Sequence, residues 1–152
     1  MGRFINYIYS QLFYPLQIIS TAMSNFSKVK NYLLDLGYTI SKEDEQEELF
    51  VVNAEEKGIV NMIVDCEGDV LVLEQHIFDC PADNVSTFKR LLQINRSVIH
   101  GAYVLDADGK KVIFRDTLQL ATLDSNELEG SINSLSFSLA ENAGNFISFA
   151  KN

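Results

Sequence analysis

Hydrophobic residues along this chain follow two different periods, one typical of helices and one typical of strands. Residues 25–36 carry apolar side chains at helical spacing, which predicts an amphipathic helix. They are Phe26, Val29, Leu33 and Leu36. Gly37 follows directly, where a helix commonly ends in a residue with positive φ. The first element of the fold is therefore expected to be this helix.

A second helix is expected after Asp83 or Asn84, either of which is a suitable N-cap. Helical spacing predicts that its buried face carries four apolar side chains. They are Val85, Phe88, Leu91 and Leu92.

A third helix is predicted from Asp124, because Glu127 follows three residues later in the arrangement of a capping box. Its apolar spacing continues to at least residue 141. Residues 142–145 offer an end to the helix and would leave an apolar tail, Phe146 to Phe149, that must pack back or meet a partner.

Between the helices lie runs of β-branched and apolar residues bounded by turn sequences. Residues 49–53, 59–65 and 70–78 are separated by Glu-Glu-Lys-Gly and Glu-Gly-Asp and predict a three-stranded antiparallel meander. Residues 101–105 and 111–118 flank Asp-Ala-Asp-Gly and predict a hairpin. The expected fold class is α+β, in the order α-β-β-β-α-β-β-α, with helices packed mainly on one face of an antiparallel sheet.

Two stretches do not follow these periods. Residues 41–48 are strongly acidic and are expected to form a solvated loop or strand edge, with an acidic binding surface as the alternative. Residues 1–22 are apolar and almost uncharged; a mis-assigned start before Met23, an amphipathic helix and a signal peptide all remain open. Polar residues interrupt this leader and exclude a transmembrane span, so residues 23–152 are expected to form one domain.

The charge balance narrows the classes of partner. Twelve Lys and Arg residues stand against 21 Asp and Glu, which gives a net charge of −9. Nucleic acid and anionic membranes are disfavoured because both require a basic face, whereas a protein partner with a basic or amphipathic segment fits. The two cysteines, Cys66 and Cys80, suit buried thiols in a reducing compartment, which indicates the cytoplasm.

Candidate chemistry is sparse. Cys66, His76, Cys80 and His100 are the soft or borderline ligands of a conceivable zinc site, but their spacings match no compact ligand pair. The Asp-x-Asp-Gly of residues 106–109 lacks the later carboxylates of a calcium loop. No nucleophile elbow or Gly-rich phosphate loop occurs, so the sequence predicts neither an enzyme nor a cofactor.

Four segments, residues 88–95, 100–106, 112–118 and 123–128, together form a recognisable pattern. They contain a Leu-Leu-x-x-Asn helix end, a hairpin of the form Leu-Asp-x-x-Gly-x-x-Val, and an amphipathic helix after Leu-Asp. This pattern resembles the Tir chaperone family of type III secretion and the related YbjN-like proteins. The resemblance implies a small acidic cytosolic protein, commonly a homodimer, whose secretion branch holds a segment of an effector protein in an extended form.

A client segment would be held by apolar strand positions on the face opposite the core. The candidates for these client-binding positions are Ile59, Ile63, Tyr103 and Ile113, each of which is equally suited to a core or dimer contact. The alternative function is a small-molecule sensor or enzyme with a pocket on the sheet, using His76 or His100 as its titrating group.

Apolar residues occur at both alternations of the strand at residues 59–65. One sheet with three helices shields one face well, so part of the second face needs cover. A homodimer is the commonest solution among soluble proteins and is expected here.

Overall fold

The computed structural model describes residues 23–80 and 85–151. The predicted leader, residues 1–22, and the predicted caps Asp83 and Asn84 lie outside these ranges. The helices of the described part are α2 (Asn25–Asp35), η1 (a 3₁₀ turn, Glu55–Lys57), α3 (Val85–Asn95) and α4 (Ser125–Phe149). The strands are β1 (Thr39–Asp44), β2 (Leu49–Ala54), β3 (Ile59–Glu67), β4 (Val70–Asp79), β5 (Ala102–Leu105) and β6 (Lys111–Gln119).

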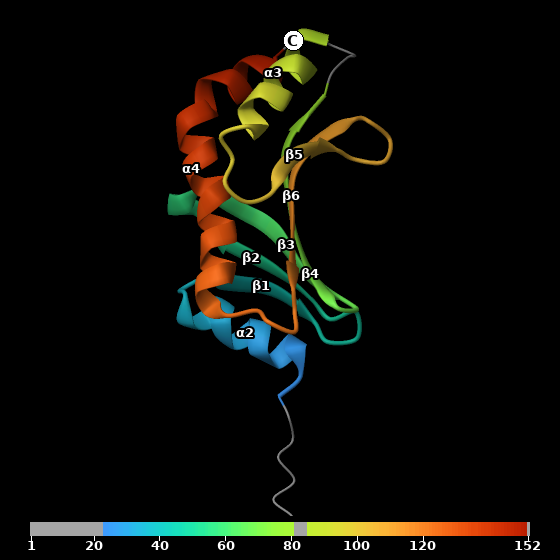
Figure 1. The fold of residues 1–152 in the computed structure, drawn as a ribbon, viewed down its shortest axis with the longest axis vertical. Helices are drawn as coiled ribbons and strands as arrows, with labels where there is room; N and C mark the ends of the chain where they lie inside the picture. Colours follow the sequence, from blue (N-terminus) through green and yellow to red (C-terminus); the bar gives the residue numbers. More distant parts are fainter. Residues whose placement is uncertain (1–22, 81–84, 152) are drawn as a thin grey trace, which may run out of the picture.

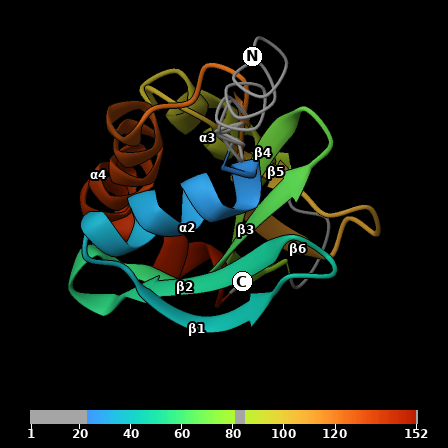
Figure 2. The ribbon, with the colours of Figure 1, turned by 90° about the horizontal axis from the view of Figure 1, so that it is seen from below.

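The described strands form one six-stranded sheet in the order β1-β2-β3-β4-β6-β5, and every neighbouring pair is antiparallel. α3 and α4 lie on one side of it (Figure 1), and the sheet curves around α2 on that same side (Figure 2). Apolar side chains from α2, α3 and α4 share a single core with this face of the sheet. The predicted α+β class, with an antiparallel sheet and helices on one face, is confirmed.

The sheet has one strand more than the sequence pattern predicts, because β1 forms within the acidic stretch. β1 pairs with β2 from Thr39↔Asn53 to Asp44↔Leu49. Most of its side chains are exposed, so it shows no apolar alternation from which a strand could be predicted. Its charges and the irregular register between Ile40 and Lys42 discourage a further strand from pairing with this free edge.

The ends of α2 and the start of α4 agree with the sequence. Gly37 has φ +82° directly after α2, as a left-handed helix end requires. The Asp124 carboxylate accepts a hydrogen bond from the Glu127 backbone N–H at 2.8 Å. Both helix boundaries were therefore predicted from local capping chemistry.

The expectation that α4 ends at residues 142–145 was wrong, because the helix continues to Phe149. Phe146 is buried and lies 4.9 Å, between ring centroids, from Tyr103. Phe78 stands 6.2 Å from Phe146 and 6.0 Å from Phe149. These aromatic contacts stabilise the last turns of the helix more than the weak helix formers before them destabilise it.

The predicted buried face of α3 was wrong in two of its positions. Val85 and Leu92 are 80% and 70% exposed, and the core side of the helix carries Thr87, Leu91 and Ile94 instead. Helical spacing is compatible with more than one buried face, and the packing of α3 against the neighbouring core determines which of its residues are buried. Two large apolar side chains of α3 consequently face outward.

Small polar side chains attach α4 to the opposite wall of the core. The Ser131 hydroxyl donates to Asp116 on β6 at 2.5 Å, and the Tyr103 hydroxyl on β5 donates to Ser138 at 2.7 Å. Ser134 bonds the backbone of His100 twice, accepting from its N–H at 3.0 Å and donating to its carbonyl at 2.9 Å. These contacts, called the serine seam below, satisfy buried polar groups and fix the position of the β5–β6 hairpin.

Asn95, the last residue of α3, closes part of the free edge of β5. Its side-chain oxygen accepts from the Tyr103 N–H at 2.8 Å, and its amide nitrogen donates to the Tyr103 carbonyl at 3.1 Å. The side chain thus takes the place of a neighbouring strand at Tyr103. This gives a physical role to the asparagine of the Leu-Leu-x-x-Asn pattern.

Asn95→Ala is expected to lower the free energy of unfolding by about 1–3 kcal/mol, because both backbone groups of Tyr103 lose their partner. Gln93→Ala, at an exposed position of the same helix, is the matched control and is expected to change stability by less than about 0.5 kcal/mol. Urea denaturation of both variants measures the difference, and equal effects would contradict the role of Asn95.

Candidate functional site

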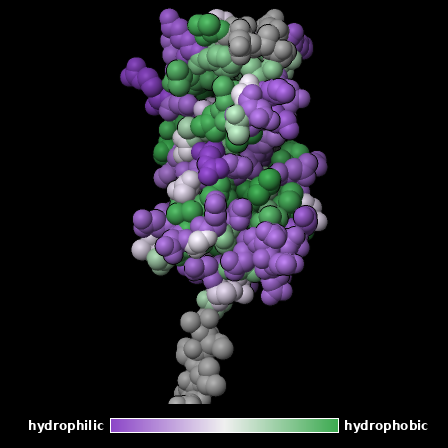
Figure 3. All heavy atoms as spheres, turned by 90° about the vertical axis from the view of Figure 1, so that its right-hand side faces the viewer, coloured by the Kyte–Doolittle hydropathy of each residue, from purple (hydrophilic) through white to green (hydrophobic). Residues whose placement is uncertain are grey.

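The side of the sheet that faces away from α2, α3 and α4, called the outer face below, has no covering element among the described residues. Figure 3 views the molecule from the side away from α4 and shows apolar side chains interrupted by polar ones. Seven leucine, valine and isoleucine side chains belong to this face by strand register. They are Leu49, Val51, Ile63, Val70, Val72, Val104 and Ile113.

These apolar side chains differ in how far they reach solvent. Ile63 is 41% exposed, and it stands directly beside Val51 on the neighbouring strand. Val72 is only 5% exposed although no helix of the described residues covers it, because neighbouring side chains on the sheet surround it. The outer face therefore contains both apolar side chains that are accessible to a partner and apolar side chains that are packed among their neighbours on the sheet.

Charges divide the apolar surface and give it a negative character. Glu74 and Arg115 form an ion pair directly across β4 and β6. Burial raises the pKa of the Asp65 carboxyl, and the nearby carboxylates of Glu67, Glu47 and Glu74 raise it further. A group of like charges of this kind favours a partner that brings positive charge.

The structure separates the four predicted client-binding residues. Ile63 and Ile113 lie on the outer face, whereas Ile59 and Tyr103 are buried in the core. For Ile59 the reason is a local irregularity: Asn61 has φ +50°, and the strand's alternation shifts so that Ile59 and Met62 both face the core. Tyr103 points toward α4, where its hydroxyl reaches the serine seam.

Sequence reasoning missed Val51, Val72 and Val104 as outer-face residues. The alternation of residues 49–54 contains the signal for Val51, because its neighbours Phe50 and Val52 are the buried ones. The run 70–73 is apolar at every position, so periodicity alone does not assign Val72 to either face. The pairing of Val72 with Asp65 on β3 assigns Val72 to the outer face.

The candidate metal ligands do not come together. Cys66 is buried on the core side of β3, and His76 lies on the outer face of β4, where its Nε2 is 2.8 Å from an Asp79 carboxylate oxygen. His100 is in the loop bonded to Ser134. Within residues 23–80 and 85–151, no group of three or more His, Cys, Asp or Glu side chains is placed to hold a metal ion.

The Asp-x-Asp-Gly segment forms the predicted hairpin turn. The Asp106 carboxylate accepts from the backbone N–H groups of Lys110 and Lys111 at 2.8 and 3.0 Å, and Gly109 takes the left-handed φ of +68°. The hydrogen bond from Lys111 is the main cause of the lowered pKa of Asp106. The carboxylate is thus engaged by the turn itself.

Three surface hollows border the helices. An apolar groove of about 480 Å³ runs between α3 and β5, and a hollow of about 440 Å³ lies between η1 and α4. A smaller pocket of about 280 Å³ lies between the loop after α3 and the middle of α4. Neither His76 nor His100 lines any of these three hollows.

The chain belongs to the CesT_Tir_1 family, whose model matches residues 22–152. The predicted resemblance to Tir chaperones is therefore confirmed. No match is found among curated proteins. No helix within residues 23–80 and 85–151 combines the length and the apolar character needed to cross a membrane.

Two solved structures show the same fold at low sequence identity, and a third aligns less well. YbjN from E. coli aligns with a TM-score of 0.63 at 15% identity, over 81% of this chain and 94% of YbjN. An uncharacterized protein from Methanothermobacter thermautotrophicus aligns with a TM-score of 0.59 at 13% identity, over 84% of this chain and 99% of that one. The type III secretion chaperone SycH from Yersinia pestis, solved with a fragment of YscM2, aligns with a TM-score of 0.45 at 13% identity, over 83% and 99%.

Three buried ionisable side chains make the free energy of unfolding fall at alkaline pH. Burial is the main cause that raises the pKa of Cys66 to about 11, and of Tyr38 and Tyr103 to about 12, from ordinary values of 9.0 and 10.0. The unfolded chain loses these protons first, so the stability they contribute is complete below about pH 9 and is lost as pH rises toward about 12.

The midpoint of urea denaturation is accordingly expected to fall steadily from about pH 9 upward. Cys66→Ala should make the decline less steep, because one of the three groups is then absent. A midpoint that stays constant up to about pH 11 would contradict the burial of these side chains.

Proposed function

We propose that this chain is a non-catalytic, cytoplasmic protein-binding module that holds an extended segment of a client protein, as a secretion chaperone does. The observation that carries the proposal is the outer face, where apolar side chains stay accessible in a member of the CesT_Tir_1 family. Exposed apolar surface of this kind marks a binding site in a soluble protein.

The client segment lies across the outer face and is held mainly through its side chains. Strand addition is disfavoured at both ends of the sheet, because β1 is charged and irregular and Asn95 occupies the outward backbone groups of Tyr103. Ile63 and Ile113 offer apolar contacts two strands apart. Extended segments with spaced apolar residues fit such a surface.

The charge of the module favours clients with a basic or amphipathic segment. The net charge is −9, and Asp65 stands among other carboxylates on the outer face. Opposite charge speeds the encounter with such a client, and the remaining negative charge keeps the complex soluble.

The alternative, a sensor or enzyme with a pocket on the sheet, has less support. A deep cavity lined by a histidine and carboxylates is the site it needs. The three hollows described above are lined without either histidine, and each of them borders a helix.

Ile63→Glu is expected to weaken client binding about tenfold or more, because it removes an apolar contact and adds a negative charge to the face. A pull-down with the tagged chain from its host should recover a specific client protein. Limited proteolysis of the complex should cut the client on both sides of the bound segment and leave that segment protected. Leu34→Glu, on the exposed side of α2, is the control and should bind normally. Turnover of a metabolite, or retention of small molecules alone, would refute the proposal.

We propose further that residues 23–152 form one domain that pairs with a second copy through the α3–β5 groove. The groove is lined mainly by apolar residues, and Leu92 and Leu105 on its rim are 70% and 43% exposed. Dimer contacts in homodimers are more apolar than the rest of a protein surface, and the groove matches that composition.

The full chain, and a chain that begins at Met23, are both expected to be dimers at micromolar concentration. Leu92→Glu should convert them to monomers, because it places a charge in the apolar contact, whereas Leu34→Glu should not. Light scattering over a range of concentrations measures the mass, and a monomer at every concentration would contradict the dimer.

A further inference from the structure

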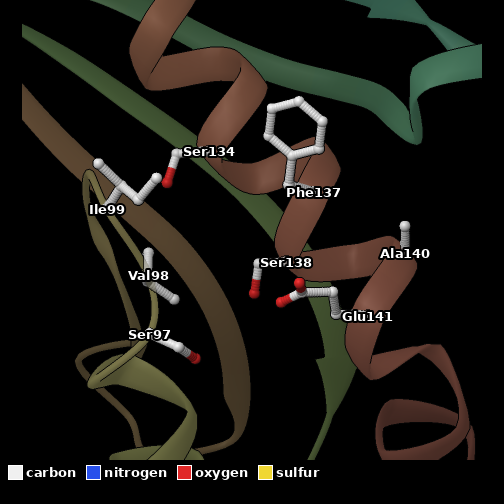
Figure 4. Close-up of a pocket in the computed structure, with 8 residues that line it drawn as sticks. All are labelled: Ser97, Val98, Ile99, Ser134, Phe137, Ser138, Ala140 and Glu141. Atoms are coloured by element: carbon white, nitrogen blue, oxygen red, sulfur yellow. The ribbon is translucent and has the colours of Figure 1, made fainter.

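The pocket between the loop after α3 and α4, called the loop–helix pocket below, has converging oxygen atoms and apolar walls. Figure 4 shows the loop residues Ser97, Val98 and Ile99 on one side and α4 on the other. The Ser138 hydroxyl and the Glu141 carboxylate lie together on the helix side, and the Ser97 hydroxyl points toward them across the gap.

The hydrogen-bond partners of these hydroxyls decide what they can still bind. Ser97 donates its hydrogen to the Ile94 carbonyl at 2.9 Å, so its lone pairs remain. Ser138 accepts from Tyr103 at 2.7 Å and keeps one lone pair besides its own hydrogen. Ser134 uses its hydroxyl in both directions on the His100 backbone. Together with the carboxylate of Glu141, which has no hydrogen, the pocket offers mainly acceptors.

The two large apolar side chains of the pocket walls are mostly exposed to solvent. Ile99 and Phe137 are 79% and 66% exposed; Ile99 belongs to the loop wall of the pocket and Phe137 to the α4 wall. A ligand that fits must therefore combine a donor-rich, positively charged end with an apolar stem.

We propose that the loop–helix pocket receives a lysine side chain of a bound polypeptide. The ammonium group has three donors, which match the three separate acceptors on Ser97, Ser138 and Glu141. Its methylene stem lies between Ile99 on the loop wall and Phe137 on the helix wall. Arginine fits less well, because its planar group binds best to a carboxylate with two parallel bonds.

The pocket is small enough for one long side chain to fill much of it. Its volume is about 280 Å³, at the lower end of the range of about 300–1,000 Å³ that is usual for small-molecule sites. The proposal rests on the proposed function, because it identifies one residue of the client.

The test uses the full chain labelled with ¹⁵N and the peptide Ac-Ala-Leu-Lys-Leu-Ala-NH₂, titrated by NMR. Saturable shifts are expected at the amides of residues 97–100 and 137–141. The same peptide with norleucine in place of lysine should bind at least about fivefold more weakly, as removal of an exposed ion pair and its hydrogen bonds implies. Butylammonium is the third probe and separates a free amine from a polypeptide.

Glu141→Gln should remove the preference for lysine over norleucine, because the carboxylate that binds the ammonium group is lost. Ile99→Ser should weaken the binding of both peptides, because it removes an apolar wall. Both positions are exposed, so neither substitution disturbs the core. Glu45→Gln removes the same charge from the exposed turn after β1 and is the matched control. Equal binding of the lysine and norleucine peptides, or shifts confined to other residues, would overturn the proposal. Butylammonium that binds as tightly as the peptide would overturn its polypeptide part.

These outcomes are independent of the client experiment. A chain that binds a client through Ile63 but shows no preference for lysine refutes the loop–helix pocket alone. A chain that prefers lysine in the pocket but recovers no client refutes the proposed function alone.

Discussion

The helices of the described residues all pack on one side of the sheet, and the rest of the structure depends on this constraint. The strands of the described part alternate so that Phe50, Met62 and Phe114 face the helices and are fully buried. α4 crosses this face with 25 residues, about 37 Å in length. Because no element of residues 23–80 and 85–151 covers the other side, apolar side chains there stay accessible for a partner.

Hydrogen bonds at the rim of the core determine where the loop–helix pocket and the α3–β5 groove form. The serine seam holds the β5–β6 hairpin against α4, and the loop between α3 and β5 is held through the backbone of His100. The same residues, Ser134 and Ser138, line the loop–helix pocket. The α3–β5 groove forms where Asn95 fastens the helix end to the strand edge. A small number of hydrogen bonds thus shapes both recesses.

Much of the fold was predictable from the sequence, because its signals are local. Capping at Asp124, the left-handed Gly37 and the Asp106 turn depend on residues close together in the chain, and the structure contains all three. β1 was missed because an exposed edge strand has no apolar alternation. The continuation of α4 through Gly144 was missed because it depends on Phe146 meeting Phe78, a contact between distant parts of the sequence.

The candidate site was less predictable, for a related reason. Ile63 and Ile113 were placed on the outer face by strand alternation, but the irregular backbone at Asn61 turned Ile59 inward. Pockets that join a loop to a helix, such as that of Ser97 and Glu141, depend on tertiary placement and carry no periodic signal. Sequence patterns therefore assign the faces of regular strands better than the positions of surface recesses.

The central claim is that the outer face contacts a client protein, and site-specific photo-crosslinking tests it most directly. A benzophenone amino acid is placed at Ile63 in one chain and at Leu34, exposed on the helical side, in another. Both chains are irradiated in their host cells, and the cross-linked products are identified by mass spectrometry. The account predicts one recurring client linked from Ile63 and little product from Leu34. A client linked from Leu34 with none from Ile63 would contradict it.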